Sequence, residues 1–305
     1  MLAGRVRVVL RNDTGLSFGD RTVSAAGCDT VAHMNQPAAP SGQVTIEVNQ
    51  AVAVLTLHSP PMNSLTRPLM LQLGERLAEC QSRPDIRAIV VQGAGTRAFS
   101  AGSDIGELQE LISSGPEALA AKFAQDRAVF GALANLHKPT VAAIEGAAIG
   151  GGLELAVCCD FIVAARNAKL LLPEIRLGVF PGSGGTVRVT KRIGAARAKR
   201  MMLLGEPVDV ATAVQWGLVD DVSEGPAIDV AMRMAQRLAA GPARAIQGCK
   251  ASILAGMTED EESALDIAKR WAVELGFGKD AAEGMRAFQE KRQPRFTEPA
   301  EMQQH

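Results

Sequence analysis

The sequence predicts an α/β protein whose C-terminal part is entirely helical. Apolar strands alternate with helical patterns from Val44 to about residue 225, and only helical patterns follow, as far as about residue 290. Parallel strands need crossover connections, and helices usually supply them. The alternation therefore indicates a sheet with crossover helices, followed by a helical domain.

Period-two alternation and continuous apolar runs mark the predicted strands. These strands are 44–48, 51–57, 86–92, 140–144, 160–165, 169–172 and 219–222. Apolar residues three or four apart mark the predicted helices, which are 65–80, 117–136, 187–204, 211–216, 226–240, 242–255 and 259–290. The first two strands meet across Asn49-Gln50, which is a hairpin signal, and residues 98–104 are predicted as a turn.

Composition excludes several classes of function. The chain has 305 residues, 47% of them apolar, so it can bury a large core. Its 32 basic and 33 acidic residues give a net charge of −1, which produces no long-range field for nucleic acid or a membrane surface. No apolar run approaches the roughly 20 residues that span a bilayer.

The cysteines favour a reducing compartment over a disulfide framework or a zinc site. They are Cys28, Cys80, Cys158, Cys159 and Cys249, an odd number without a CxxC pair. The adjacent pair lies in an apolar run and is interpreted as small buried hydrophobes. None of the four histidines has metal-ligand spacing. We therefore expect a cytoplasmic protein without a metal site.

Residues 1–43 differ from the rest and are predicted to be a flexible extension. No periodic pattern extends beyond Val6–Leu10. Four arginines weakly resemble those of an organelle transit peptide, but such peptides are usually poor in acids and three aspartates occur here. A mitochondrial matrix location is therefore the weaker alternative, and the working start could be Met34. The other predicted domains are a core at 44–235 and a helical domain at 236–305.

The stretch Gly146-Ala-Ala-Ile-Gly-Gly-Gly-Leu-Glu154 is the strongest local signal for chemistry. It lies between a predicted strand and a short helix, where glycines allow a sharp turn and leave the first helical amides unpaired. Such fixed donors stabilise an oxygen that gains negative charge during a reaction. Glu154 adds an acid or base beside them, or alternatively only favours the positive end of the helix.

Three glycine turns follow predicted strands, at 100–104, 150–154 and 181–186, and none has the spacing of a phosphate loop or a dinucleotide fold. The surrounding stretches Phe99–Ile105, Gly146–Leu155 and Pro173–Thr186, with Gly284–Arg292 near the end, resemble the successive signatures of the enoyl-CoA hydratase/isomerase (crotonase) family. The resemblance extends from about residue 44 to 297.

The resemblance implies a crotonase-like spiral of ββα repeats, in which two nearly perpendicular sheets are capped by C-terminal helices. It implies an acyl-CoA thioester as substrate and an enolate as the charged species. It also implies a homotrimer or a dimer of trimers. No cofactor is expected, because coenzyme A is part of the substrate, and neither nucleic acid nor a membrane is expected as a partner.

Four residues match the family's catalytic positions. The backbone amides of Ser103 and Gly151 match the oxyanion hole. Glu154 and Glu174 match the two glutamates of members that hydrate a trans-2-enoyl thioester to a 3-hydroxyacyl thioester. By this analogy, Glu154 takes a proton as water attacks the β-carbon, and Glu174 supplies a proton to the α-carbon. Isomerases of the family typically keep a carboxylate only near the second position, so two glutamates favour a hydratase of fatty-acid or related acyl-CoA degradation.

The resemblance also implies contacts to coenzyme A at two loops and one basic residue. The matching positions are Met62, Asn63, Ser64, Leu65, Ala101, Asp104, Ile105 and Lys291. Cations that many members carry beside the loops are missing, because Pro60–Met62 and Gly106 stand in their places. Recognition of the phosphates is therefore expected to depend mostly on Lys291, which in relatives sometimes reaches in from a neighbouring subunit.

Other functions remain open. Leu171 replaces a small residue common in the family and, with Leu170 and Leu172, forms an expected wall that would narrow the acyl pocket. This wall motivates the alternative of an isomerase, or another crotonase-type reaction on a bulky or cyclic acyl-CoA. One branch of the family binds RNA through a lysine-rich first helix, but residues 66–87 here are nearly balanced in charge. An inactive homologue is disfavoured because both glutamates are present.

Overall fold

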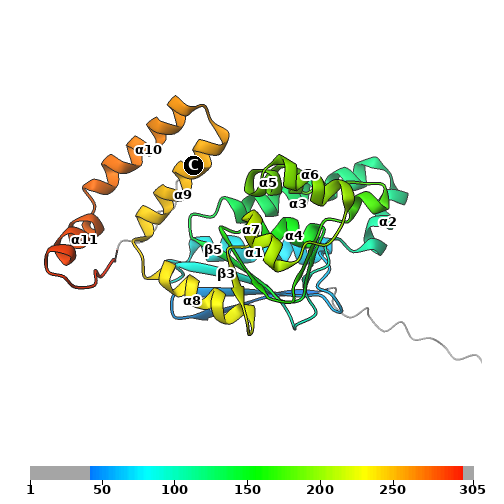
Figure 1. The fold of residues 1–305 in the computed structure, drawn as a ribbon, viewed down its shortest axis with the longest axis horizontal. Helices are drawn as coiled ribbons and strands as arrows, with labels where there is room; N and C mark the ends of the chain where they lie inside the picture. Colours follow the sequence, from blue (N-terminus) through cyan, green and yellow to red (C-terminus); the bar gives the residue numbers. More distant parts are fainter. Residues whose placement is uncertain (1–41, 298–305) are drawn as a thin grey trace, which may run out of the picture. The chain divides into compact units, whose positions relative to one another are not determined.

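The computed structural model of the chain describes residues 42–297, in which nine strands and eleven α-helices follow one another (Figure 1). The first two strands form the predicted hairpin. β1 (Gln43–Asn49) pairs antiparallel with β2 (Val52–His58), and Gln50 makes the turn with φ +55°. The predicted N-terminal extension lies almost wholly outside the described residues and stays a prediction.

The main sheet extends this hairpin by four parallel strands. These are β3 (Ala88–Gly93), β5 (Thr140–Ile144), β7 (Phe161–Ala165) and β9 (Asp221–Ser223). The strand order is β1-β2-β3-β5-β7-β9, and every pair after the hairpin is parallel. β5 is buried along its whole length, as expected for a strand covered on both faces.

Helices cover both faces of the main sheet (Figure 1). α8 (Ala227–Ala239) places a row of buried alanines against one face, where small side chains allow close packing. α1 (Arg67–Ser82) and α3 (Pro116–Ala134) pack against the larger core on the other face. α8 crosses the domain boundary predicted at residues 235 and 236, and the division into domains stays a prediction.

A second sheet was not predicted in full. It consists of β4 (Ala98–Ser100), β6 (Ala147–Ile149) and β8 (Lys169–Leu171), all parallel, in that order. Only β8 was predicted as a strand, whereas the sequence placed β4 and β6 within turns. Both are only three residues long, which is too short to show a period in the sequence, and only their pairing defines them.

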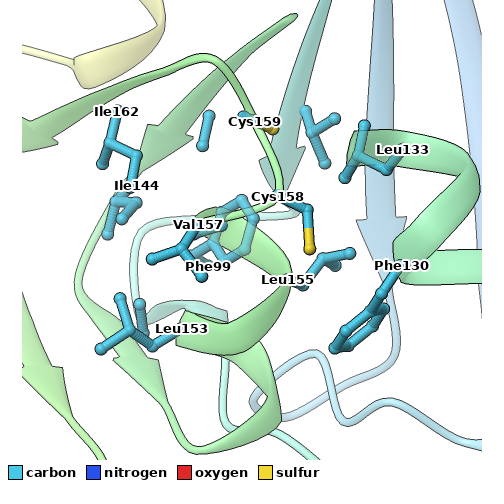
Figure 2. Packing of buried hydrophobic residues seen from close by; sticks show 14 of the residues in the cluster. Phe99, Phe130, Leu133, Ile144, Leu153, Leu155, Val157, Cys158, Cys159 and Ile162 are labelled. Carbon is cyan, nitrogen blue, oxygen red and sulfur yellow. The ribbon is translucent and has the colours of Figure 1, made fainter. Parts of the chain in front are cut away.

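Buried side chains of α4 (Gly151–Ala156) and the segment after it join the second sheet to the larger core. Figure 2 shows Leu153 and Leu155 of this helix beside Phe99, with Phe130 nearby. Cys158 lies in the same cluster, and burial raises the pKa of its thiol to about 12. The interpretation of the adjacent cysteines as small buried hydrophobes is therefore confirmed.

Two helices that were predicted as continuous are broken. The predicted helix 187–204 is α5 (Gly185–Ile193) followed by α6 (Ala195–Leu204), because Gly194 lies between them at φ +80°. The predicted helix 259–290 is α10 (Glu261–Gly276) followed by α11 (Lys279–Gln289). The helical period of apolar residues in the sequence does not reveal a break of one or two residues between two helices.

Three further helices complete the fold. α2 (Ile105–Ser114) was not predicted, and it begins where the Asp104 side chain accepts the Glu107 amide. α7 (Val210–Trp216) precedes β9, and α9 (Ala243–Thr258) packs along α10. No helix among the described residues is both long and apolar enough to cross a membrane.

Candidate active site

Two glycine turns bring two backbone amides together at the ends of β4 and β6. Gly102 has φ +83°, and a Cβ built there would lie 2.8 Å from the Gly151 nitrogen. A Cβ on Gly151 would lie 3.6 Å from the Ser103 nitrogen. The two peptide segments therefore touch through their backbones, which only glycine permits here.

Both amides are available to a ligand. Gly151 begins α4, so its amide has no acceptor in the preceding turn of helix. Among the described residues, the Ser103 amide donates to no backbone acceptor either. Two neighbouring N–H groups without partners can bind one oxygen that carries negative charge. This arrangement brings together the two residues that the sequence proposed as an oxyanion hole.

The surrounding loops hold the first turn in place. The Ser100 hydroxyl accepts the Gly102 amide at 3.1 Å, and the Gly102 carbonyl accepts the Leu65 amide at 2.8 Å. The Met62 carbonyl accepts the Ala101 amide at 2.9 Å. The loop before α1 and the loop after β4 are thus tied together by their backbones.

Glu154 is a buried acid on α4, with only 3% of its surface exposed. Its Oε1 accepts the backbone N–H of Gly185 at 2.6 Å. Burial raises the pKa of this carboxyl to about 7; the Gly185 hydrogen bond opposes the rise, and the charge of Glu174 adds to it. An acid that titrates near neutrality can accept and release protons under physiological conditions.

Glu174 is the second acid and lies beside the glycine turn. It begins a short 3₁₀ helix, η1 (Glu174–Leu177), and a Cβ on Gly150 would lie 3.1 Å from its Oε1. Its Oε2 is buried without a hydrogen-bond partner in the described part of the chain. Burial raises the pKa of Glu174 above its ordinary value. Glu174 therefore holds a proton more tightly than a carboxyl in water does, and its Oε2 has no hydrogen-bond partner among the described residues.

The third glycine turn, at residues 181–186, holds Glu154 but does not follow a strand. It comes after η1, because the residues following β8 form that 3₁₀ helix instead of continuing the sheet. The prediction that all three turns follow strands was wrong for this one. The turn nevertheless supplies the Gly185 amide that contacts Glu154.

An ion pair on α3 lies against this third turn and was missed by sequence reasoning. Lys122 and Asp126 are 2.6 Å apart and both buried, and the Asp126 carboxylate accepts the Ser183 hydroxyl at 3.1 Å. The negative charge of Asp126 also contributes to raising the pKa of Glu154. The signal available in the sequence was a Lys and an Asp four residues apart on a predicted helix, which alone usually marks a solvated face.

The structure groups most positions expected to contact coenzyme A on the two joined loops. Met62, Ser64 and Leu65 lie before α1, and Ala101, Asp104 and Ile105 follow β4. The Asn63 side chain is committed to the framework, because its amide donates to Ala94 and Ala98 and its carbonyl oxygen accepts the Ser59 amide. These assignments stay predictions.

Lys291 lies apart from this group within one chain. It follows α11, is exposed, and has φ +54°. Figure 1 shows α11 well separated from α4, whose first residue supplies one of the two amides. The structure therefore does not bring Lys291 to the site of its own chain.

The prediction that three leucines form a wall of the acyl pocket is wrong for two of them. Leu170 and Leu172 are fully buried in the larger core. Leu171 alone points to the opposite face of the sheet, because neighbouring residues in a strand alternate. Its carbonyl accepts the Gly150 amide at 2.8 Å, which places it next to the glycine turn.

Comparison with known proteins identifies the family. The family described as enoyl-CoA hydratase/isomerase matches residues 47–299. An (E)-benzylidenesuccinyl-CoA hydratase from Thauera aromatica is 37% identical over 83% of this chain and 98% of its own length. A crotonyl-CoA hydratase from Syntrophomonas wolfei is 33% identical over 83% of this chain and 97% of its own.

The crystal structure of an enoyl-CoA hydratase from Bacillus anthracis superposes with a TM-score of 0.78 at 31% identity, covering 83% of this chain and 98% of that one. The chain therefore belongs to the enoyl-CoA hydratase/isomerase family. The predicted crotonase fold, with its C-terminal helices, is confirmed. The prediction of an enzyme of the enoyl-CoA hydratase type is confirmed as well.

Proposed function

We propose that the protein hydrates a trans-2-enoyl-CoA thioester to the 3-hydroxyacyl-CoA. The observation that carries this proposal is the pair of buried carboxyls next to two neighbouring backbone amides. Burial raises the pKa of both acids, and that of Glu154 reaches about 7. Hydration needs one acid that takes a proton from water and a second acid that gives a proton to carbon, and two neighbouring carboxyls can supply these two roles.

Each group then has one role in the reaction. Ionised Glu154 takes a proton from water while the water oxygen bonds to the β-carbon. Electrons of the double bond move toward the thioester oxygen, where the amides of Ser103 and Gly151 stabilise the enolate charge. Protonated Glu174 gives its proton to the α-carbon. Return of the proton from Glu154 to Glu174 restores the starting state.

The first experiment measures the loss of enoyl-thioester absorbance with crotonyl-CoA and a longer 2-enoyl-CoA. We expect fast hydration by the wild type and a loss of about two orders of magnitude or more in Glu154→Gln and in Glu174→Gln, because each removes one proton transfer. Both substitutions keep the shape of the side chain, and binding of the product thioester serves as the control for folding. A wild type that binds thioesters without hydrating them would refute the proposal.

Isomerisation is the second candidate, and the unpartnered Oε2 of Glu174 favours it. A single protonatable oxygen beside the two amides could move a proton between C2 and C4 of a 3-enoyl-CoA without help from Glu154. A bulky acyl group would by itself fit hydration as well, because one relative is named (E)-benzylidenesuccinyl-CoA hydratase. Conversion of a 3-enoyl-CoA that survives Glu154→Gln would favour isomerisation over hydration.

We further propose that coenzyme A enters as part of the substrate and that no separate cofactor takes part. The two acids, the two amides and water complete the proton and charge transfers described above. No group of three His, Cys, Asp or Glu within residues 42–297 could hold a metal ion. Lys291 would then contact the phosphates from a neighbouring subunit, which requires the predicted trimer or hexamer.

A further inference from the structure

Among residues 42–297, the ion pair between Lys122 and Asp126 is the one buried charge pair near the site that the proposed reaction does not use. Only 1% of Lys122 and 4% of Asp126 is exposed, and their charged atoms are 2.6 Å apart. Burying two charges costs desolvation energy that their attraction barely recovers, so well-packed apolar side chains would stabilise α3 as well or better. Stability alone does not explain this pair.

A chain of contacts links the pair to Glu154. The Asp126 Oδ2 atom that binds Lys122 also accepts the Ser183 hydroxyl at 3.1 Å. Two residues further along the chain, the Gly185 amide donates to Glu154 at 2.6 Å. Ser183 is buried, so water cannot easily replace Asp126 as its partner.

Other contacts leave the turn little freedom. A Cβ on Gly182 would lie 3.1 Å from the Phe123 ring, so α3 also packs against the turn next to Ser183. The Arg188 guanidinium donates to the Ser183 carbonyl at 3.3 Å. The hydroxyl of Ser183 is thus a polar link between α3 and a turn that is also held by packing, by α5 and by its backbone donors to Glu154.

We propose that Asp126 is a positioning residue that, through Ser183, places the Gly185 amide on the carboxylate of Glu154. The proposal rests on the proposed hydration. Lys122 neutralises the charge of Asp126. The Asp126 carboxylate can therefore hold the turn through Ser183 without adding a full negative charge beside Glu154.

Four charged groups around Glu154 determine how each substitution shifts the pKa of its carboxyl. They are Glu174 on η1, Asp126 and Lys122 on α3, and Arg188 on α5. Loss of the Ser183 hydroxyl weakens the Gly185 donor, which favours the protonated acid. Asp126→Asn keeps an acceptor for Ser183 but leaves the charge of Lys122, which favours the ionised acid. The two substitutions should therefore shift the titration of Glu154 in opposite directions.

The experiment compares Ser183→Ala, Ser183→Thr and Asp126→Asn with the wild type in crotonyl-CoA hydration. We expect kcat to fall about tenfold to a hundredfold in Ser183→Ala with KM little changed, because a small misplacement of a catalytic group costs rate more than binding. Ser183→Thr, which keeps the hydroxyl, should recover most of the rate. Ser252→Ala removes a hydroxyl that donates to the Gly248 carbonyl within its own helix, α9, and should match the wild type.

Infrared titration of Glu154 supplies the decisive readout. Its carboxyl band is identified by its loss in Glu154→Gln. We expect the pH at the midpoint of the Glu154 titration to rise in Ser183→Ala and to fall in Asp126→Asn. A merely structural role would not produce this pair of shifts. If Asp126→Asn does not fold because Lys122 is left unpaired, Ser183→Ala alone decides the matter.

The outcomes separate this proposal from the proposed function. A wild type that hydrates crotonyl-CoA, together with a Ser183→Ala variant of unchanged kcat and unchanged midpoint, would overturn the positioning role only. A wild type that does not hydrate would refute the proposed reaction. The infrared midpoints would still support or overturn the link from Asp126 to Glu154 in that case, because they need no turnover.

Discussion

The backbone N–H of Gly185 donates to Oε1 of Glu154 across 2.6 Å, between residues 31 positions apart in the chain. A Cβ on Gly185 would lie 2.9 Å from the same oxygen, so a larger residue would displace the acid. The donor favours the ionised carboxylate, but burial has the larger effect and raises the pKa of Glu154 to about 7. The Gly185 amide thus holds the acid in place, while the pKa of Glu154 stays near 7.

The rate of hydration should depend on pH through Glu154. We expect kcat/KM to rise with pH until about 7, because Glu154 must be ionised before it can take a proton from water. A profile measured with crotonyl-CoA checks this, and a rate that stays constant from about pH 5 to pH 8 would contradict it.

The stability of the protein should also reflect the buried acid. The native pKa of Glu154 is raised from 4.5 to about 7, so its stabilising contribution is complete below pH 4.5 and is lost as the pH rises to about 7. The shift corresponds to about 3 kcal/mol as an order of magnitude. Glu154→Gln should therefore be more stable than the wild type at pH 8 and nearly equal to it at pH 4.

Guanidinium unfolding at the two pH values measures this difference. The Glu79 carboxyl serves as a control, because its pKa is lowered by Arg76 and it is not part of the site. Glu79→Gln should therefore not gain stability as the pH rises. Equal stability of Glu154→Gln and wild type at pH 8 would show that the acid is not held in a desolvated position.

Gly102→Ala should separate the two amides. A Cβ there would lie 2.8 Å from the Gly151 nitrogen, and φ of +83° is strained for alanine. We expect kcat to fall about a hundredfold to a thousandfold, the effect of losing one donor to an oxyanion. The matched control is Gly256→Ala in α9, where nothing lies within 4 Å, and this variant should keep its activity and gain up to about 1 kcal/mol of helix stability.

Leu171 should influence which acyl groups are accepted. Leu171→Gly should raise the ratio of kcat/KM for a bulky 2-enoyl-CoA to that for crotonyl-CoA, because it removes the side chain of a residue whose carbonyl accepts the Gly150 amide of the glycine turn. Leu170→Ala and Leu172→Ala are the controls. Both residues are core, so these changes should cost about 2–5 kcal/mol of stability without changing the ratio. An unchanged ratio in Leu171→Gly would place the acyl group elsewhere.

Much of the fold could be predicted because its strands are long enough to show a period. The strand predicted at 140–144 is β5, and the hairpin across Asn49-Gln50 is β1 with β2. The second sheet could not be predicted completely, since β4 and β6 have three residues each. Their identity as strands depends on hydrogen bonds to partners about 20 to 50 residues away.

The sequence by itself determined which backbone positions had to be glycine and which acids stood near them, and these features sufficed to indicate the family. Only the tertiary structure decided that Leu170 and Leu172 are core, and that Asp126 reaches the turn holding Glu154. It also decided that the pKa values of both acids are raised. Burial, and with it the pKa of a carboxyl, depends on every segment packed around the group, and no local pattern in the sequence records that packing.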